Sequence, residues 1–386
     1  MLKRVIIDNY KSIRHAEIDF GRINILIGEN GAGKSNLCSF FELAQVGSRG
    51  MNQYIHTHLG MGRILHGGPR KSRTLSGQLL FEGYTDGDNQ LMEQGDTAYS
   101  FEIGIAIDGT TPVVLEEAQY IRIPEGSGIE AGEKSLLGGV AEDEELRQLN
   151  VGMVAESNPG FLSAVGRVRF IKVPINSISI FHFSDTGDGA EIRSKVSLDD
   201  NAGLKKNGGN LAAVLYLIKE KDPQAFRLIE SMMRRVAPYF KCFDLKPDRL
   251  NPNLITIEWK ELDSEVYLDS TSFSDGTIRF LALSVLLLQP NPPKTIVIDE
   301  PELGLHPAAI SMLAGLIRRA SHKSQIIVAT QSPDLLGEFS LNDVIVVDRR
   351  DGQSTFNRFD EETFKEWLSE YSVGELWKKN LIGGQP

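Results

Sequence analysis

Cysteine and long apolar runs are both scarce in this chain of 386 residues. Its two cysteines, Cys38 and Cys242, cannot build the disulfide framework of a small secreted domain, so we expect two buried thiols in a reducing cytoplasm. The longest apolar run, residues 280–288, is too short to cross a bilayer and indicates a core helix. The N-terminus reads as a charged strand and not as a signal peptide. We therefore expect a cytoplasmic protein without a membrane partner.

An excess of positive charge is also missing. The formal net charge of −11 argues against a protein that coats nucleic acid, so any DNA contact must be local. Residues 63–73 form a local basic segment, which fits either phosphate binding or a solvated loop. The hydrophobic content of 41% is ordinary for a globular protein, and no sustained heptads predict a long coiled coil.

Residues 28–35 read GENGAGKS and fit the pattern G-x-x-x-x-G-K-[ST] at every fixed position. We call them the phosphate loop. A short buried strand at residues 23–27 precedes the loop and an amphipathic helix follows it, as the motif requires. We expect Lys34 to contact the β- and γ-phosphates and the Ser35 hydroxyl to hold Mg²⁺. The candidate nucleotide-binding residues here are Asn30, Gly31, Ala32, Gly33, Lys34, Ser35 and Asn36.

Two predicted strands around residues 9–13 come directly before the phosphate loop. The turn between them brings Lys11 and Arg14 either near a nucleotide or into solvent, and both interpretations stay open. Lys11 is included among the candidate nucleotide-binding residues.

A second candidate segment, residues 272–277, opens the apolar helix. Ser274 and Gly276 lie where helix-end amides and the helix dipole attract anions, which suits a γ-phosphate. An ordinary N-cap is the alternative interpretation, because serine and aspartate are favoured there.

Two further strands end in polar residues. Residues 295–298 lead into Asp299 and Glu300, and residues 325–329 lead into Gln331. Parallel sheets bind ligands at the carboxyl ends of their strands, so we expect these side chains at one edge. Asp299 would join the Mg²⁺ shell, Glu300 would polarise the attacking water, and Gln331 would face the γ-phosphate.

Together these segments resemble the ABC-type ATPases of the RecF/SMC-like class, in particular small AAA-type ATPases without coiled-coil arms or a fused nuclease. The resemblance covers residues 1–45 and 268–340. It implies an α/β fold, a two-lobed ABC ATPase head with a mixed sheet. The residue patterns themselves predict an antiparallel β-subdomain, from the alternating apolar residues at 101–107, and a helical insertion lobe. We therefore divide the chain into an N-terminal lobe at residues 1–124, a flexible and helical insertion at 125–253 and a C-terminal lobe at 254–386.

The resemblance also implies a function. ATP would be sandwiched between the heads of a homodimer, with Ser274 and Gly276 of each head contacting the nucleotide of the other. Mg²⁺-dependent hydrolysis would use Glu300, Gln331 and Lys34 as catalytic residues and would be coupled to DNA repair, recombination or anti-phage defence. The alternative is a slowly hydrolysing, ATP-gated clamp or sensor that recruits or restrains a separate effector nuclease or toxin.

Two residues depart from the pattern of the class. Asp275 stands where many ABC proteins have glycine, and Gln331 stands where histidine is usual. Glutamine does not titrate near neutral pH, so it can orient water or bond a phosphate but cannot shuttle a proton. We therefore expect slow turnover, which favours the clamp.

Overall fold

A computed structural model describes residues 1–55, 60–85, 91–105, 112–122, 135–137 and 175–384. Residues 125–134 and 138–174 of the expected insertion lie outside the described part. The chain forms two compact units that interleave along the sequence. Unit 1 contains Met1–Gly21, Glu29–Ile178 and Val346–Asn357, and unit 2 contains Arg22–Gly28, Ser179–Ile345 and Arg358–Pro386. The three-part division by sequence stays a prediction.

Unit 1 is built on an antiparallel sheet with the strand order β2-β1-β4-β5-β6-β7. This sheet confirms the expected antiparallel β-subdomain. In β1 the buried side chains include Val5 and Ile7, because alternate residues of a strand face the same side. The strands are β1 (Leu2–Tyr10), β2 (Ile13–Asp19), β4 (Thr74–Thr85), β5 (Leu91–Ile105), β6 (Pro112–Arg122) and β7 (Ser135–Leu137).

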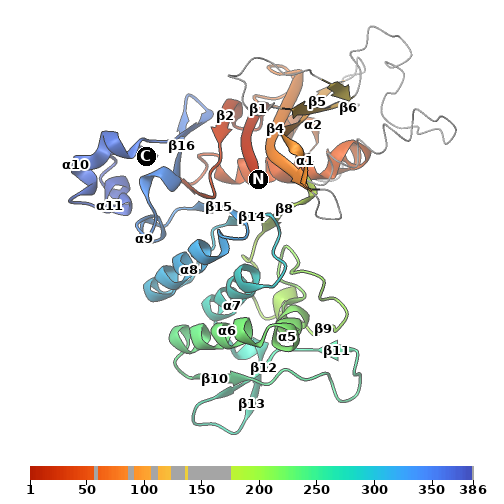
Figure 1. Cartoon of the computed structure of the whole chain (residues 1–386), viewed down its shortest axis with the longest axis vertical. Coiled ribbons are helices and arrows are strands. Elements are labelled where there is room, and N and C mark those ends of the chain that lie inside the picture. The colour runs from red at the N-terminus through yellow and green to blue at the C-terminus, as the bar shows by residue number, and fades with distance from the viewer. Residues whose placement is uncertain (56–59, 86–90, 106–111, 123–134, 138–174, 385–386) are drawn as a thin grey trace, which may run out of the picture. The chain divides into compact units, whose positions relative to one another are not determined.

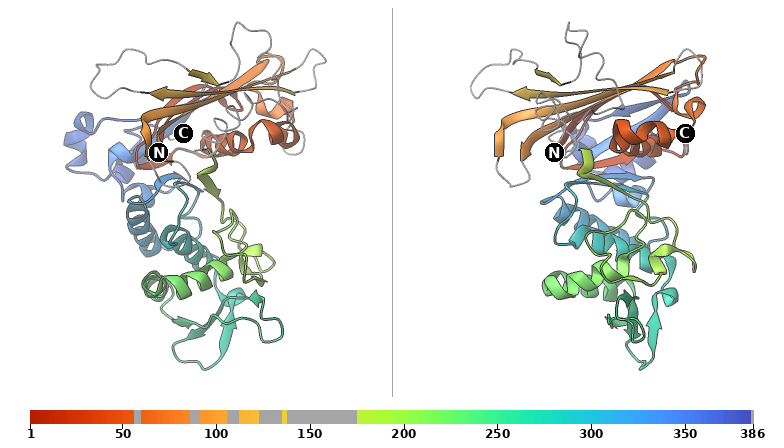
Figure 2. Two further views of the ribbon diagram at one scale, coloured as in Figure 1. Left: turned by 45° about the vertical axis from the view of Figure 1, so that its right-hand side comes forward. Right: turned by 90° about the vertical axis from the view of Figure 1, so that its right-hand side faces the viewer.

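Helix α1 (Lys34–Tyr54) lies against one face of this sheet (Figure 2). Its Phe40 ring stacks on Phe101 at a centroid distance of 5.6 Å and meets Tyr10 edge-on at 5.5 Å. Gly77 permits this approach, because a Cβ there would lie 2.5 Å from the Phe40 ring. Cys38 of α1 is buried as expected, whereas Cys242 is only partly buried, and the two do not form a disulfide. The short helix α2 (Met61–Ile64) also belongs to unit 1.

A hairpin near the end of the chain consists of β16 (Val344–Arg350) and β17 (Gln353–Asn357). Its turn residues Asp351 and Gly352 both have positive φ, 51° and 77°, as tight hairpin turns require. Strand β16 starts in unit 2 and continues into unit 1. There the backbone N–H of Ser354 in β17 donates to the Ser12 carbonyl oxygen at 2.8 Å.

Unit 2 is centred on three parallel strands, β3 (Ile23–Ile27), β15 (Gln325–Thr330) and β14 (Thr295–Asp299). The full order of their mixed sheet is β17-β16-β3-β15-β14-β8, where β8 spans Ile178–Phe181 (Figure 1). Ile27 pairs with Thr330, and Asp299 pairs with Ala329. The three parallel strands therefore end at the same level.

Four helices of unit 2 lie side by side: α5 (Leu211–Lys221), α6 (Pro223–Val236), α7 (Asp275–Leu288) and α8 (Pro307–Ala320) (Figure 1). Almost all of α7 is buried, which confirms the predicted core helix. Within the described ranges, no helix is both long and apolar enough to span a membrane.

Smaller elements complete unit 2. A three-stranded sheet contains β10 (Phe240–Phe243), β12 (Glu258–Glu261) and β13 (Tyr267–Asp269), and β9 (Val196–Ser197) pairs with β11 (Leu254–Ile255). Three short helices follow β15: α9 (Pro333–Leu336), α10 (Lys365–Leu368) and α11 (Val373–Lys378). Trp259 of β12 stacks on Phe273 at 4.5 Å, directly before α7.

We expect Trp259→Ala to lower the free energy of unfolding by about 3–5 kcal/mol, because Trp259 is fully buried and its removal leaves a cavity. Urea unfolding followed by circular dichroism measures the loss. Trp367→Ala is the control, since the Trp367 side chain is exposed. Equal losses in the two variants would contradict the packing role of Trp259.

Candidate functional site

The phosphate loop runs from the end of β3 to the start of α1. Gly31 and Gly33 have φ values of 79° and 124°, which side-chain-bearing residues rarely adopt. Asn36 and Leu37 donate their backbone N–H groups to the Gly33 carbonyl oxygen and thereby start the helix. The loop therefore has the local form that the motif predicts, while its nucleotide contacts stay predictions.

Lys34 is buried, and its Nζ donates to the Glu29 carbonyl oxygen at 3.0 Å. Its ammonium group thus lies against the loop itself. Asn30, Gly31 and Ser35 are exposed, whereas Ala32 is buried. Some of the residues predicted to bind the nucleotide are therefore exposed to solvent, and others are buried.

Two residues that sequence reasoning missed hold the loop from its carbonyl side. Arg349 donates from a guanidinium nitrogen to the Gly31 carbonyl oxygen at 3.1 Å, and the buried Ser354 hydroxyl donates to the Ala32 carbonyl oxygen. A Cβ on Gly33 would lie 2.1 Å from Ser354 Oγ. The hairpin of β16 and β17 therefore packs directly on the phosphate loop within unit 1.

The turn before the loop takes part in the same contacts. Ser12 Oγ lies 2.6 Å from Ser354 Oγ and accepts from the Asn36 side-chain amide at 2.7 Å. Asn36 therefore has a structural partner, and its proposed nucleotide contact stays a prediction.

Lys11 lies on this turn with a φ of 48°. Its Nζ donates to Ser39 Oγ on α1 at 2.7 Å and lies 5.2 Å from the Tyr10 ring centroid. Burial lowers the pKa of the Lys11 ammonium group. Arg14 is exposed. Whether Lys11 contacts a nucleotide stays a prediction.

The acidic residues of unit 2 follow β14. Asp299 ends the strand, and its Oδ2 lies 3.8 Å from His182 Nδ1. Glu300 has a φ of 47°, an uncommon left-handed conformation for a non-glycine residue. Strained backbone of this kind clusters at functional sites, which supports the choice of Glu300 as a candidate.

Gln331 lies next to Glu300. Its side-chain amide donates to Glu300 Oε1, and its backbone N–H donates to Glu302 Oε1 at 3.1 Å. The structure thus brings two predicted catalytic residues together and adds Glu302. Sequence reasoning missed Glu302, although it stands only two positions after Glu300.

Burial raises the pKa of the Glu302 carboxyl group, and the nearby Glu300 acts in the same direction. Glu302 Oε1 also accepts from Thr330 Oγ1 at 2.6 Å. Its other oxygen, Oε2, is buried and has no hydrogen-bond partner among the described residues.

Ser274 is the N-cap of α7, as the alternative interpretation expects. Its hydroxyl accepts from the backbone N–H of Thr277 at 3.2 Å. A Cβ on Gly276 would lie 2.3 Å from the Gly304 carbonyl oxygen, so close backbone packing requires this glycine. Both residues thus have structural roles within unit 2. Their contact with a γ-phosphate stays a prediction.

The departure at Asp275 has a physical explanation. The buried Arg193 donates to Asp275 Oδ1 at 3.0 Å and to the Phe273 carbonyl oxygen at 3.0 Å. Arg193 therefore ties both the side chain of Asp275 and the preceding backbone into unit 2. Nothing near Arg193 in the sequence marks this role.

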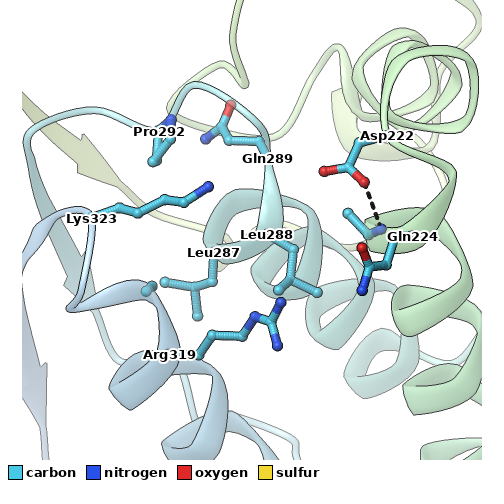
Figure 3. A pocket seen from close by; sticks show the side chains of 10 residues that line it. Asp222, Gln224, Leu287, Leu288, Gln289, Pro292, Arg319 and Lys323 are labelled. Carbon is cyan, nitrogen blue, oxygen red and sulfur yellow. Dashed lines mark hydrogen bonds between the residues drawn. The ribbon is translucent and has the colours of Figure 1, made fainter.

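A pocket in unit 2 lies apart from these candidate residues. Figure 3 shows its lining, which includes Asp222, Arg319 and Lys323 around Leu287 and Leu288. The Asp222 carboxylate accepts from the backbone N–H of Ala225 at 3.0 Å and caps α6. No predicted site residue lines this pocket.

Two family models match the chain. Residues 166–337 match the family described as "AAA domain, putative AbiEii toxin, Type IV TA system". Residues 1–55 match the family described as "AAA ATPase domain". A comparison with proteins of curated function finds no match.

Solved structures show the same fold. One is an Smc head bound to the C-terminal winged-helix domain of ScpA, with a TM-score of 0.59 and 14% identity, covering 95% of this chain and 99% of that one. Another, from Pyrococcus furiosus, is an Smc head with an extended coiled coil bound to the C-terminal domain of ScpA. It has a TM-score of 0.56 and 16% identity and covers 96% of this chain and 98% of that one. The expected ABC-head fold is therefore confirmed.

We expect Ser354→Ala to weaken ATP binding about three- to tenfold, because it removes a buried hydrogen bond that holds the loop before the ligand arrives. Equilibrium titration with a fluorescent ATP analogue measures the dissociation constant. Ser340→Ala is the control, since the exposed Ser340 hydroxyl bonds Asp343 and contacts no residue of the phosphate loop among those that the structure describes. An unchanged dissociation constant in Ser354→Ala would contradict the role of the hairpin.

Glu302→Gln tests the electrostatic environment of the buried carboxyl. Folding raises the pKa of Glu302, so protonated Glu302 favours the folded state. This contribution to the free energy of unfolding is fully present below pH 4.5, the ordinary pKa of the group, and is lost as the pH rises through the folded-state pKa. The variant should therefore gain stability over the wild type with increasing pH, by about 1.4 kcal/mol for each unit by which the pKa is raised.

Denaturation at several pH values measures this gain. Glu375→Gln is the control, because hydrogen bonds from Ser372 lower the pKa of Glu375. This variant should lose stability relative to the wild type with increasing pH, the opposite of Glu302→Gln. A stability difference between Glu302→Gln and the wild type that does not change with pH would contradict the raised pKa.

Proposed function

We propose that the chain binds ATP with Mg²⁺ and hydrolyses the nucleotide between two copies of itself. The premise is that the chain is an AAA-type ATPase with the ABC fold of an SMC head. The observation that carries this proposal is the register of β3, β15 and β14. Ile27 pairs with Thr330, and Ala329 pairs with Asp299, so the first residue of the phosphate loop, Gln331 and the two acids all follow strand ends at one level.

The oxygen donors predicted for this site are of the type that binds a magnesium ion. Ser35 provides a hydroxyl oxygen and Asp299 a carboxylate oxygen, and Mg²⁺ prefers hard oxygen ligands of this kind. Bound there, the ion would neutralise negative charge on the phosphates. Lys34 would contribute a positive charge from the phosphate loop.

Glu300 and Gln331 have complementary roles in this proposal. Glu300 accepts a proton from the attacking water as general base. Gln331 orients that water, since an amide can donate and accept hydrogen bonds but does not titrate. In the structure the Gln331 amide donates to Glu300 Oε1, which occupies one acceptor site of the base. This contact supports the proposal that both side chains act on the same water.

The dimer is proposed by analogy with SMC heads, with Ser274 and Gly276 of one copy contacting the nucleotide of the other. Coupling to DNA repair, recombination or anti-phage defence is part of the same proposal. Its support is the exposed basic side chains of the segment at residues 63–73, which offer local phosphate contacts to DNA. These side chains are Arg63, Arg70, Lys71 and Arg73.

The second candidate function is an ATP-gated clamp or sensor that controls a separate effector. The glutamine at position 331 favours it, because a side chain that does not titrate near neutral pH cannot shuttle a proton, and turnover is then slow. The match to a family described with an AbiEii toxin suggests a toxin as one class of effector. The Smc heads bound to ScpA domains are precedents for a partner protein on this fold.

We expect the ATPase rate per chain to rise steeply with protein concentration, because two copies complete each site. Glu300→Gln should lower kcat by about 10²–10⁴-fold, since it removes the general base. Turnover assays at several concentrations, with size analysis in ATP, measure both effects. Glu338→Gln is a matched control, because the Glu338 carboxylate pairs with Arg318 and lies outside the proposed site.

An unchanged rate in Glu300→Gln would rule out the proposed base. Near-zero rates with stable ATP-bound dimers in the wild type would favour the clamp. A monomer that exchanges ATP freely would contradict both candidate functions.

A further inference from the structure

Glu302 lies between the two turns that carry the proposed catalytic residues. It belongs to the turn after β14, where the backbone N–H of Leu305 donates to the Glu302 carbonyl oxygen at 2.9 Å. Its side chain crosses to the turn after β15, and Oε1 accepts from Thr330 Oγ1 at 2.6 Å and from the Gln331 N–H at 3.1 Å. One carboxylate oxygen thus joins two turns that belong to different strands.

The turn after β15 is anchored from within as well. Thr330 is fully buried, and its Oγ1 accepts from the backbone N–H of Ser332 at 2.9 Å. Ser332 in turn caps α9 by accepting from the Leu335 N–H at 3.1 Å. The contacts of Glu302 therefore act on a turn that is already tied to α9.

Gln331 is held at both ends by carboxylates. Its backbone N–H donates to Glu302, and its side-chain amide donates to Glu300. The anchored backbone fixes the Cα from which the Gln331 side chain extends, and from this position its amide reaches Glu300. Removing Glu302 would free the Gln331 N–H and widen the range of positions that the amide samples.

This arrangement costs stability. Burial disfavours the charged form of Glu302, and its Oε2 is buried without a hydrogen-bond partner among the described residues. A smaller or neutral side chain would avoid this penalty. Polar groups that are buried at a cost are expected mainly at functional or strained sites.

We propose that Glu302 is a positioning residue for hydrolysis: it fixes the backbone of Gln331 so that the side-chain amide reaches Glu300. The inference rests on the proposed function, because it assumes that Glu300 and Gln331 act on the attacking water. Glu302 itself touches neither the water nor the nucleotide in this scheme. The turns after β14 and β15 are then coupled through the Glu302 side chain.

Glu302→Ala should lower kcat about 10–100-fold, because small misplacements of a catalytic group have effects of this size. The KM for ATP should change less than about threefold, since the phosphate loop is untouched. Glu302→Gln should restore kcat to within about threefold of the wild type, because its amide oxygen can accept the same two hydrogen bonds. Steady-state kinetics of the full chain separates kcat from KM.

A double-mutant cycle distinguishes positioning from a general loss of structure. If Glu302 acts through Gln331, Glu302→Ala should lower kcat no further in a Gln331→Ala background. Additive losses would overturn the proposal. Glu338→Ala is the matched control for removing a partly exposed carboxylate of unit 2 and should leave kcat unchanged.

Hydrogen–deuterium exchange gives a readout that does not depend on turnover. Peptides containing Gln331 should exchange faster in Glu302→Ala than in the wild type and in Glu302→Gln, because the N–H loses its acceptor. Unchanged exchange in Glu302→Ala would overturn the proposal, as would faster exchange with an unchanged kcat. If the wild type binds ATP without hydrolysing it, the proposed function fails, and exchange alone then decides whether Glu302 holds Gln331.

Discussion

The register of three parallel strands is the constraint on which the candidate site depends. Strands β3, β15 and β14 come from distant parts of the chain, yet their backbone pairing ends them at one level. Each strand is buried along nearly its whole length, so a slip by one residue would exchange the side chains that pack on its two faces. The polar residues that follow the strands are therefore aligned with one another, because the backbone hydrogen bonds of the sheet fix where each strand ends.

Buried polar side chains do the finer positioning within each unit. In unit 1, the Ser354 hydroxyl donates to the Ala32 carbonyl oxygen of the phosphate loop. In unit 2, Arg193 holds the backbone before α7, and Glu302 holds the turn at Gln331. Each of these groups loses hydration on folding, so its hydrogen bonds must offset a desolvation cost. Loops held in this way have few alternative conformations, which suits groups that must meet a ligand with defined geometry.

Local sequence patterns predicted the elements of the fold well. The strand at residues 23–27, the helix after the phosphate loop and the core helix all appear in the structure. These features depend on short-range spacing, turn chemistry and apolar runs, which are visible in one stretch of sequence. The buried state of Cys242 was predicted wrongly, because the residue is only partly covered.

The sequence by itself determined the phosphate loop and the strand ends that carry Asp299, Glu300 and Gln331, because each follows from adjacent residues. The tertiary structure alone decided that Ser354 supports the loop and that Arg193 pairs with Asp275. Both contacts join residues far apart in the chain, and no local pattern encodes which distant side chain will fill a given space. Folding brings such partners together through the packing of whole elements, so their pairing becomes visible only in three dimensions.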